Sequence, residues 1–574
     1  MGIPGMGAVQ SPSAENSADA LAEASAVPQQ ALGGIASQES GSAGAPASGF
    51  ELHDTAARRA LQADLGDRAA HSAAWRAGGS VAGAIVRLGV LAVLARRLPP
   101  SAFGVVAMSA VVTGFASTVT ELGLSSAIVQ RPRLASAQLW GIFRLTLGIS
   151  LALWGCCAVV SPLVGRFFHE PQAGPVLLVS AAMLPITALA AVPWGLLARY
   201  LEFKKIAICE LADVVVNGAV SVSMALLGMG VWSLVGGTLA GLAVSTLLLL
   251  VFSPWRPTPS RGAIEWGALV RFGTAVAAMS LAFYWTDRVV NLLVGRLLGS
   301  MALGLYVVAF NLAIGVAGQV SAVTRVVAFP AFSAIQHDPS RLAAAYKRCV
   351  RWSAALAFPF CALMAVLAPQ FVSFFLGAQW AACVLPFRLL LAVGAMRSLY
   401  GFSGLVLRSV GRPQTELAIQ TVFAGGVAVA SFIGARGGIG GVAAGGALFV
   451  CLLGGPLFIT MAARASRVGL LSVLRCASGP AFAAAAAAAI ASVGGRAGAV
   501  MWPQAPALAA LAVGGMVGLL TYVVALRLVA GDLFVEARSR LPEALRAGGL
   551  GRILGGSTAP EPRLQSRESK TRAT

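Results

Sequence analysis

The sequence predicts an all-α integral membrane protein with about fourteen transmembrane helices. Of its 574 residues, 57% are hydrophobic and only 11% are charged, and the mean hydropathy is +0.80, far above the value for soluble globular proteins. Apolar runs of roughly 20 residues, the length that spans a bilayer, recur from about residue 76 to residue 528. Because little of the chain is left to build a soluble catalytic domain, we expect no enzyme.

The apolar runs define fourteen candidate spans in chain order. They cover approximately residues 78–95, 103–120, 139–163, 175–197, 211–228, 231–252, 270–293, 302–324, 352–375, 383–406, 415–434, 439–462, 477–494 and 507–527. Glycine-rich segments near Met229 and Gly438 indicate tight turns between neighbouring spans. A count of twelve or thirteen stays open if one of these pairs does not fully cross.

The two ends of the chain are polar and rich in helix-breaking residues. Residues 1–74 contain no apolar run of signal-peptide length and begin without a basic segment, which predicts a disordered cytoplasmic arm and no cleaved leader. Residues 531–574 are expected to form a basic cytoplasmic tail. With the N-terminus inside, the cytoplasmic loops hold seventeen Lys and Arg residues and the outside loops six, so the positive-inside rule places both termini in the cytoplasm.

The net charge of +20 reflects this topology and not a nucleic-acid site, because the basic residues are dispersed among short loops. The eight cysteines show no CxxC spacing and the four histidines are far apart, which argues against a disulfide framework, a metal site or a bound cofactor. The chain also lacks a GxxxxGK[ST] sequence, so direct ATP drive is not expected.

A short internal match points to a repeat. The segments "ARRLPPSAFG" (Ala95 to Gly104) and "GRLLGSMALG" (Gly295 to Gly304) align without gaps at an offset of 200 residues, with four identities. Each links a span to its successor. The match predicts two six-helix halves, 75–265 and 266–465, related by a parallel pseudo-two-fold axis along the membrane normal, and two additional helices in 466–530. Substrate would bind in a cavity between the halves.

Charged residues at membrane depth are costly, so they normally face a cavity or a partner. In the seventh span, a spacing of 4, 3 and 4 places one polar set on a single helical face: Ser280, Tyr284, Asp287 and Asn291. The second span carries a similar stripe that ends before Glu121, although Ser and Thr are equally common in helix packing: Ser109, Thr113, Ser117 and Thr120.

At the 200-residue offset, Arg87 of the first span corresponds to Asp287. One hypothesis is that the two pair in at least one conformational state; the other is that water or neighbouring side chains neutralise each separately. Arg288 lies about 100° around the helix from Asp287 and is a second candidate cavity cation. Arg325 is either a cavity residue or an anchor that reaches the headgroups.

Three further charged residues rank below these. Arg144 and Arg397 are additional candidates for the cavity, whereas Asp213, beside Glu210, is expected at the membrane interface. Arginine suits phosphate recognition, and a buried acid such as Asp287 or Glu121 could couple transport to H⁺ or Na⁺.

Three segments resemble the polysaccharide exporter and lipid-linked oligosaccharide flippase branch of the multidrug/oligosaccharidyl-lipid/polysaccharide (MOP) superfamily. They are "LARRLPPSAFGVVAMSAVVTGFASTVTELGLSSAIVQR" (Leu94 to Arg131), "LGLYVVAFNLA" (Leu303 to Ala313) and "FPAFSAIQHDPSRLAAAYKRCVRW" (Phe329 to Trp352). In the first, Pro99 stands where the family pattern has a glycine. The resemblance covers most of residues 75–460.

The resemblance implies alternating-access export of an undecaprenyl-pyrophosphate-linked glycan across the bacterial inner membrane, for exopolysaccharide or lipopolysaccharide biosynthesis. A polysaccharide polymerase and export machinery would be its partners. It further implies that pyrophosphate or glycan is contacted in the cavity by Arg87, Arg288, Asn291, Tyr284 and Arg325. Asp287 or Glu121 would couple transport to the movement of an ion. The alternative is a cation-coupled small-molecule or drug antiporter of the same architecture, which predicts an acid-dominated cavity. A membrane-embedded glycosyltransferase would need a longer loop than this chain has.

Overall fold

The computed structural model describes residues 78–80, 82–121, 128, 136–200, 202–259 and 266–540, with the side chains of residues 121, 266–279, 316–331, 334, 535 and 537–540 outside the description. Its elements lie in one compact unit, Arg68–Thr574. The described residues form helices and turns, with no β-strand among them. Twelve helices in this part of the chain are long and apolar enough to cross a membrane. The protein is therefore an all-helical, multi-pass membrane protein, as its composition predicts.

The helices before residue 266 form the N-terminal group. It begins with a helix over Gly78–Arg97, which carries no label in the figures. Then follow α4 (Pro100–Glu121), α6 (Ser136–Phe168), α7 (Ala173–Ser180), α8 (Met183–Arg199), α9 (Phe203–Leu226) and α10 (Val231–Phe252).

The long element α11 (Trp266–Ala334) begins the C-terminal group. Next come α12 (Pro339–Val366), α13 (Ala368–Phe371), a π-helical turn (Val372–Leu376) and a 3₁₀ turn (Ala378–Cys383). The group continues with α14 (Val384–Tyr400), α15 (Ser403–Ser409), α16 (Pro413–Gly434), a 3₁₀ turn (Ala435–Gly437), α17 (Gly438–Phe449), a π-helical turn (Val450–Gly454) and α18 (Gly455–Ala465). It closes with α19 (Leu470–Met501), α20 (Pro506–Val529) and α21 (Gly531–Arg540).

The described part of the chain has twelve candidate spans and not the fourteen expected from the sequence, because two of the twelve each contain two of the expected segments. A glycine with positive φ marks each of these two spans: Gly299 has φ 83° inside α11, where two helical segments meet at a kink, and Gly438 has φ +66° at the start of α17. A positive φ is readily adopted only by glycine. The spans that contain these residues, Ser280–Gly315 and Pro413–Ala465, are each counted once, although each holds two of the segments expected from the sequence.

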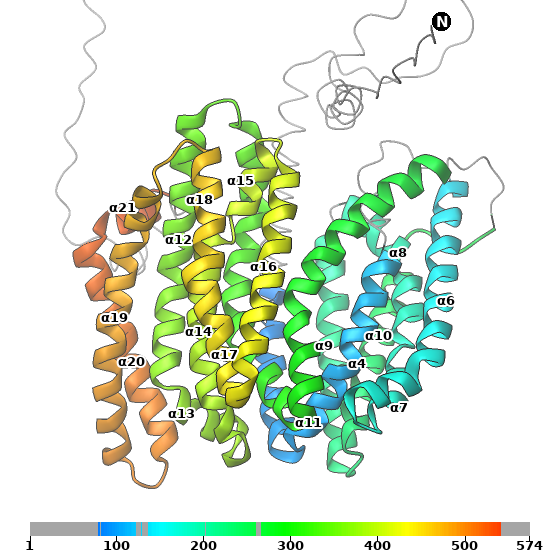
Figure 1. The fold of residues 1–574 in the computed structure, drawn as a ribbon, viewed down its shortest axis with the longest axis horizontal. Helices are drawn as coiled ribbons and strands as arrows, with labels where there is room; N and C mark the ends of the chain where they lie inside the picture. The colour runs from blue at the N-terminus through cyan, green and yellow to red at the C-terminus, as the bar shows by residue number, and fades with distance from the viewer. Residues whose placement is uncertain are drawn as a thin grey trace, which may run out of the picture. The chain divides into compact units, whose positions relative to one another are not determined.

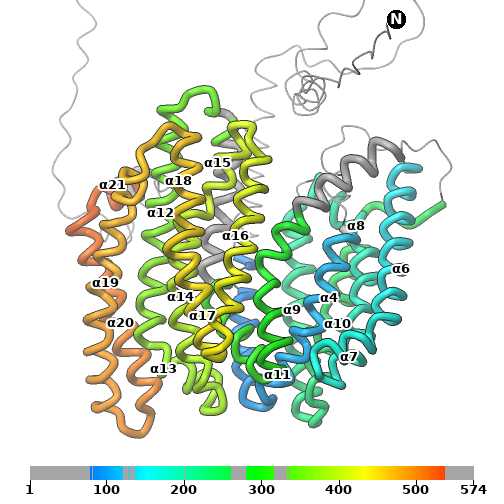
Figure 2. Tube along the Cα trace, viewed as in Figure 1, coloured from blue at the N-terminus to red at the C-terminus, as the bar shows by residue number. Residues whose placement is uncertain are grey.

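α11 packs against helices from both groups (Figure 1). It contacts α4 most extensively on one side and α14 and α16 on the other. The pair α9 and α10 packs together, and α19 and α20 pair with each other beside α12; Figure 2 traces the same arrangement along the backbone. Residues on α11 can therefore contribute to pockets on two sides.

The crossing of α4 with α11 is built on two glycines at equivalent positions of the internal match. A Cβ added at Gly104 would lie 1.8 Å from the carbonyl oxygen of Ser300, and one added at Gly304 would lie 1.8 Å from that of Pro100. Only glycine allows backbones to approach so closely. The contacts are reciprocal at the 200-residue offset, since Pro100 corresponds to Ser300 and Gly104 to Gly304.

The two turns Val372–Leu376 and Ala378–Cys383 contact the C-terminal end of the helix Gly78–Arg97 and the start of α4. Trp380 is fully buried, and its Nε1 donates a hydrogen bond of 2.8 Å to the carbonyl oxygen of Ala95. Its ring meets Phe103 edge-on at 5.3 Å. The Arg96 guanidinium donates to the carbonyl oxygen of Phe374. These contacts join the first helix to the C-terminal group.

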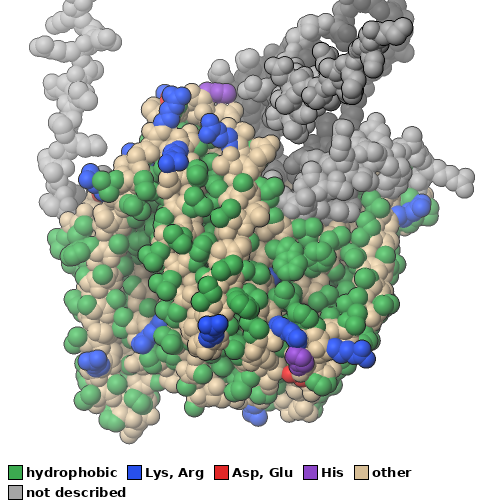
Figure 3. Space-filling view, viewed as in Figure 1, with side chains coloured by type: hydrophobic (Ala, Val, Ile, Leu, Met, Phe, Trp, Pro, Cys, Tyr) green, Lys and Arg blue, Asp and Glu red, His purple; other side chains and the backbone are tan. Residues whose placement is uncertain are grey.

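The surface is that of a lipid-embedded protein. In Figure 3, hydrophobic side chains cover the flanks of the described helices, and Lys and Arg gather toward their two ends. On α19 and α20, for example, Phe482, Met516 and Leu528 are more than half exposed. In water such an apolar area would drive association, whereas in a bilayer it faces acyl chains.

Candidate functional site

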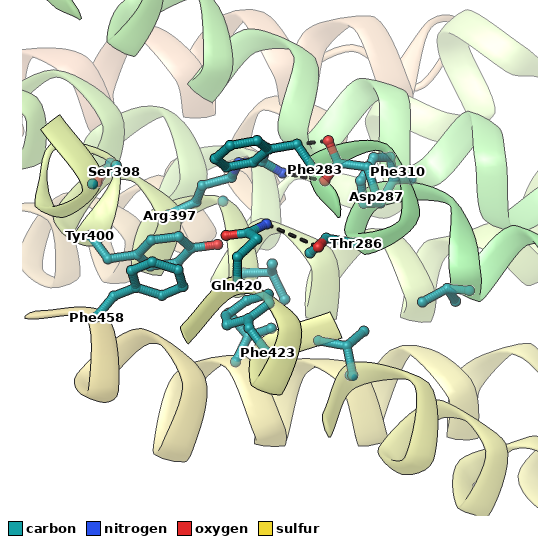
Figure 4. Close-up of a pocket in the computed structure, with 18 of the residues that line it drawn as sticks. Phe283, Thr286, Asp287, Phe310, Arg397, Ser398, Tyr400, Gln420, Phe423 and Phe458 are labelled. Atoms are coloured by element: carbon teal, nitrogen blue, oxygen red, sulfur yellow. Dashed lines mark hydrogen bonds and ion pairs between the residues drawn. The ribbon is translucent and has the colours of Figure 1, made fainter. Parts of the chain in front are cut away.

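Asp287 of α11 forms an ion pair with Arg397 of α14 (Figure 4). Arg397 Nη1 donates to Asp287 Oδ1 at 3.2 Å, and Nη2 donates to Oδ2 at 3.5 Å. The guanidinium and the carboxylate thus meet through two parallel hydrogen bonds, the geometry that Arg alone offers. Both side chains keep access to open space, with exposed fractions of 35% and 47%.

A second pair, Arg408 with Glu416, lies in the same region. Arg408 Nε donates to Glu416 Oε2 at 2.7 Å and Nη2 to Oε1 at 2.8 Å. The two residues flank the turn between α15 and α16, where Gly411 has φ +73°. Glu416 is buried, and a Cβ at Gly404 would lie only 2.3 Å from its Oε1, so the glycine makes room for the carboxylate.

These pairs line a cavity of about 180 Å³ that α11, α14, α15 and α16 enclose with parts of α17 and α18. Gln420 of α16 reaches across it and donates to Thr286 Oγ1 at 2.9 Å. Aromatic rings form much of the remaining wall: Tyr400 and Phe458 stack at 5.4 Å with an interplanar angle of 16°, and Phe283 lies on the α11 side. We call this space the C-terminal cavity.

A second pocket of about 450 Å³ lies between the helix Gly78–Arg97 and helices α4, α9, α10 and α11, and we call it the N-terminal pocket. Arg87 and Arg288 line it together with Asp213, and Asn217 and Asn311 add amide groups. Arg87 acts electrostatically on Asp213. With two cations and one acid, this pocket carries a net positive charge.

A third pocket of about 370 Å³, which we call the connecting pocket, shares lining residues with both. It shares Asp287, Phe283 and Phe310 with the C-terminal cavity and Arg288 and Asn311 with the N-terminal pocket. All three spaces are therefore lined in part by α11. Consecutive side chains on a helix point about 100° apart. Asp287 therefore faces the C-terminal cavity, whereas Arg288 faces the N-terminal pocket.

Most of the predicted polar face of the seventh span does line these pockets. Ser280, Tyr284 and Asp287 line the connecting pocket, but Asn291 is buried, with 4% of its surface exposed, and lines none of the three. Tyr284 also has a packing role, because its single hydroxyl hydrogen is shared between the carbonyl oxygens of Ala110 and Val111 in α4, which lie 3.1 and 2.5 Å from the hydroxyl oxygen.

In this structure Asp287 pairs with Arg397, a lower-ranked candidate, and Arg87 lies beside Asp213 in the N-terminal pocket. Arg144 is exposed and lines none of the three pockets. The side chains of Glu121, at the end of α4, and of Arg325, in α11, lie outside the described residues.

The serine and threonine stripe of α4 belongs to helix packing over most of its length. Ser109, Thr113 and Thr120 are buried, and their hydroxyls donate to carbonyl oxygens of their own helix. From this helix, Thr118 lines the connecting pocket. The alternative of simple packing, which the sequence left open, describes these residues.

Sequence reasoning missed several cavity residues. Asp213 was expected at the interface because the fifth span was predicted to start at residue 211, whereas α9 begins at Phe203 and places Asp213 well inside the helix. Arg408 was counted as a cytoplasmic loop residue. A signal for the second ion pair was available in the sequence: Arg408 and Glu416 are eight residues apart, on either side of a Gly-Arg-Pro turn.

Comparison with known proteins gives matches in sequence and in fold. A family model described as "Polysaccharide biosynthesis protein" matches residues 93–385. The lipopolysaccharide biosynthesis protein WzxC of Escherichia coli (strain K12) is 27% identical over 337 residues, which are 57% of this chain and 68% of that protein. The succinoglycan biosynthesis transport protein ExoT of Rhizobium meliloti (strain 1021) is 28% identical over 295 residues, 50% of this chain and 58% of that protein.

Among solved structures, the lipid II flippase MurJ in an inward closed conformation superimposes with a TM-score of 0.61. The superposition covers 80% of this chain and 99% of that chain, at 13% sequence identity. At this identity the match concerns the fold alone. It shows that most of this chain has the fold of that flippase.

Proposed function

This chain belongs to the polysaccharide biosynthesis protein family, whose members are transporters and not enzymes, and we propose that it moves a lipid-linked oligosaccharide or polysaccharide intermediate from the cytoplasmic to the periplasmic side. Transport would proceed by alternating access and serve exopolysaccharide or lipopolysaccharide biosynthesis. The family membership confirms the resemblance found in the sequence. The substrate, the direction and the mechanism are the proposal.

The observation that carries the proposal is the cationic N-terminal pocket at membrane depth. Arg87 and Arg288 approach it from different helices, with Asn311 beside them. Placing two guanidinium groups within an apolar helical bundle is costly, and the cost is understandable if an anionic group binds there. Arginine's planar fork suits the oxygens of a pyrophosphate. An antiporter for cationic drugs would instead favour acidic walls.

Asp287 is the candidate for ion coupling within the described side chains. Its pairing with Arg397 joins α11 to α14, and protonation of the carboxylate or binding of a cation would compete with the guanidinium for it. A group whose partner changes in this way can bias one conformation over another. Glu121 and Arg325 remain sequence-based proposals for coupling and for substrate contact.

The proposed topology has fourteen spans with both termini in the cytoplasm of a bacterial inner-membrane protein. The positive-φ residues Gly299 and Gly438 support it, since each lies where the sequence separates two spans. The reciprocal approach of Gly104 and Gly304 supports two halves, 75–265 and 266–465, related by a pseudo-two-fold axis. The Trp380 contacts would then close the periplasmic end. A periplasm-active reporter fused after residue 530 should stay inactive; activity there would overturn the orientation.

Deletion of the gene in its own bacterium tests the function. We expect lipid-linked oligosaccharide to accumulate on the cytoplasmic leaflet and exported polysaccharide to fall, with recovery when the full chain is supplied. Normal polysaccharide export in a deletion strain without a paralogue would refute the proposal. Increased sensitivity to cationic drugs with unchanged polysaccharide would instead identify a drug antiporter.

A further inference from the structure

The C-terminal cavity differs from the N-terminal pocket in charge. Its two carboxylates, on Asp287 and Glu416, are matched by two guanidinium groups, on Arg397 and Arg408. These four charges cancel, whereas the N-terminal pocket has a net positive charge. An anion therefore gains little from entering the C-terminal cavity, and the ligand that suits it is uncharged.

The same cavity is rich in planar hydrogen-bonding groups. A guanidinium offers five N–H donors and an ionised carboxylate about four acceptor sites, and each ion pair here uses two of each. Gln420 adds an amide held in place by Thr286. Such paired donors and acceptors suit a ligand that carries several neighbouring hydroxyl groups.

Aromatic rings complete the lining. Tyr400 and Phe458 contribute the stacked pair, and Phe283 and Phe310 line the cavity from α11. Figure 4 shows these rings around Gln420 and the Asp287–Arg397 pair. In such a pocket, flat apolar faces contribute affinity for the ligand, and a few polar groups beside them fix its orientation. A sugar ring has this double character, because its C–H face is apolar and its hydroxyl edge is polar.

We propose that the C-terminal cavity is a subsite for an uncharged saccharide residue of the substrate. This inference rests on the proposed function, in which the N-terminal pocket takes the pyrophosphate. The first sugar of such a substrate is bonded directly to the phosphate, so the two subsites must be neighbours. Asp287 of the C-terminal cavity and Arg288 of the N-terminal pocket are adjacent in the chain, and both line the connecting pocket, which agrees with this requirement.

The test compares four lipids on the purified full chain in lipid nanodiscs. One is undecaprenyl pyrophosphate, and the other three are the same lipid linked to a single glucose, galactose or N-acetylglucosamine. Titration followed by tryptophan fluorescence gives a Kd for each. For the best sugar we expect tighter binding than for the sugar-free lipid. We define the ratio as the Kd of the sugar-free lipid divided by the Kd of the sugar-linked lipid. The variant Gln420→Met should lower this ratio about tenfold, the effect of one good hydrogen bond.

Two other variants keep the result interpretable. Thr286→Val should lower the ratio by less, because it only releases Gln420. Thr421→Val is the matched control, since Thr421 also lies on α16 but its hydroxyl donates to its own helix at Leu417 and it lines none of the three pockets. Binding of the sugar-free lipid should be the same in all three variants.

The outcomes separate the two proposals. If the sugar-free lipid binds as tightly as every sugar-linked lipid, or if Gln420→Met and Thr286→Val leave the ratio unchanged, the saccharide subsite is refuted while the proposed function stands. If neither kind of lipid binds to the native chain, the proposed function fails and this inference fails with it.

Discussion

Replacing Gly104 or Gly304 with alanine places a methyl group inside the crossing of α4 and α11. The new Cβ would lie 1.8 Å from a backbone carbonyl oxygen in either case, whereas ordinary contact begins at 3.4 Å. The helices must therefore move apart, because a backbone carbonyl group cannot rotate out of the way as a side chain can. We expect each single change to reduce the free energy of unfolding by about 1–3 kcal/mol, the range for overpacked interiors.

The double variant tests whether the two contacts form one crossing. A separation forced by one methyl group already makes room for the other, so the loss in the double variant should fall short of the sum by about 0.5–3 kcal/mol. Unfolding of the purified chain in mixed micelles, followed by circular dichroism, measures these losses. Gly315→Ala is the control on α11, since a Cβ there meets nothing within 4 Å. Strictly additive losses, or a Gly104→Ala variant as stable as the control, would refute a shared crossing.

Three further predictions concern the ion pair, the closed end and a helix cap. Asp287→Asn or Arg397→Gln alone should lower both the melting temperature and polysaccharide export, because each leaves one charge without its partner. The double variant should regain stability but not export. Full export in either single variant would contradict the coupling proposal. Trp380→Phe removes the hydrogen bond to Ala95 and should cost about 1 kcal/mol of unfolding free energy, and an unchanged value would show that this bond does not hold the end closed. Asp338, just before α12, accepts hydrogen bonds from Ser340 and Arg341, which hold the pKa of its carboxyl below the ordinary 3.8. The contribution of this carboxylate to stability should be present above about pH 4 and lost as the pH falls further. In melting curves measured against pH, Asp338→Ala should remove that contribution.

The sequence was sufficient to predict which helical face of the seventh span is polar, because side-chain direction along a helix follows its period. It could not predict what that face would meet. The 200-residue offset predicts the depth of Arg87 relative to Asp287 but not the direction in which either points. The partner that the structure gives Asp287 is Arg397, since α14 packs against α11 there.

Other residues depended on where helices begin and end. Glu416 and Arg408 meet only because the α15–α16 turn folds back at Gly411, and sequence alone assigned that stretch to a loop. Asn291 fits the spacing of the polar face but is buried, and it lines none of the three pockets although Val290 beside it lines the C-terminal cavity. Hydrophobic periodicity therefore predicted the helices and much of the connecting pocket, whereas the ion pairs needed three-dimensional packing.

The most direct test of the account follows the movement of the lipid-linked glycan itself. The purified chain is reconstituted in vesicles with an undecaprenyl-pyrophosphate-linked glycan, and the fraction of glycan that becomes accessible to an external, membrane-impermeant glycosidase is measured over time. We predict that the native chain and the Arg144→Gln control expose the glycan at equal rates and that Arg288→Gln slows exposure at least tenfold. Equal rates in vesicles with and without the protein, or an Arg288→Gln variant as fast as the control, would contradict the central claim.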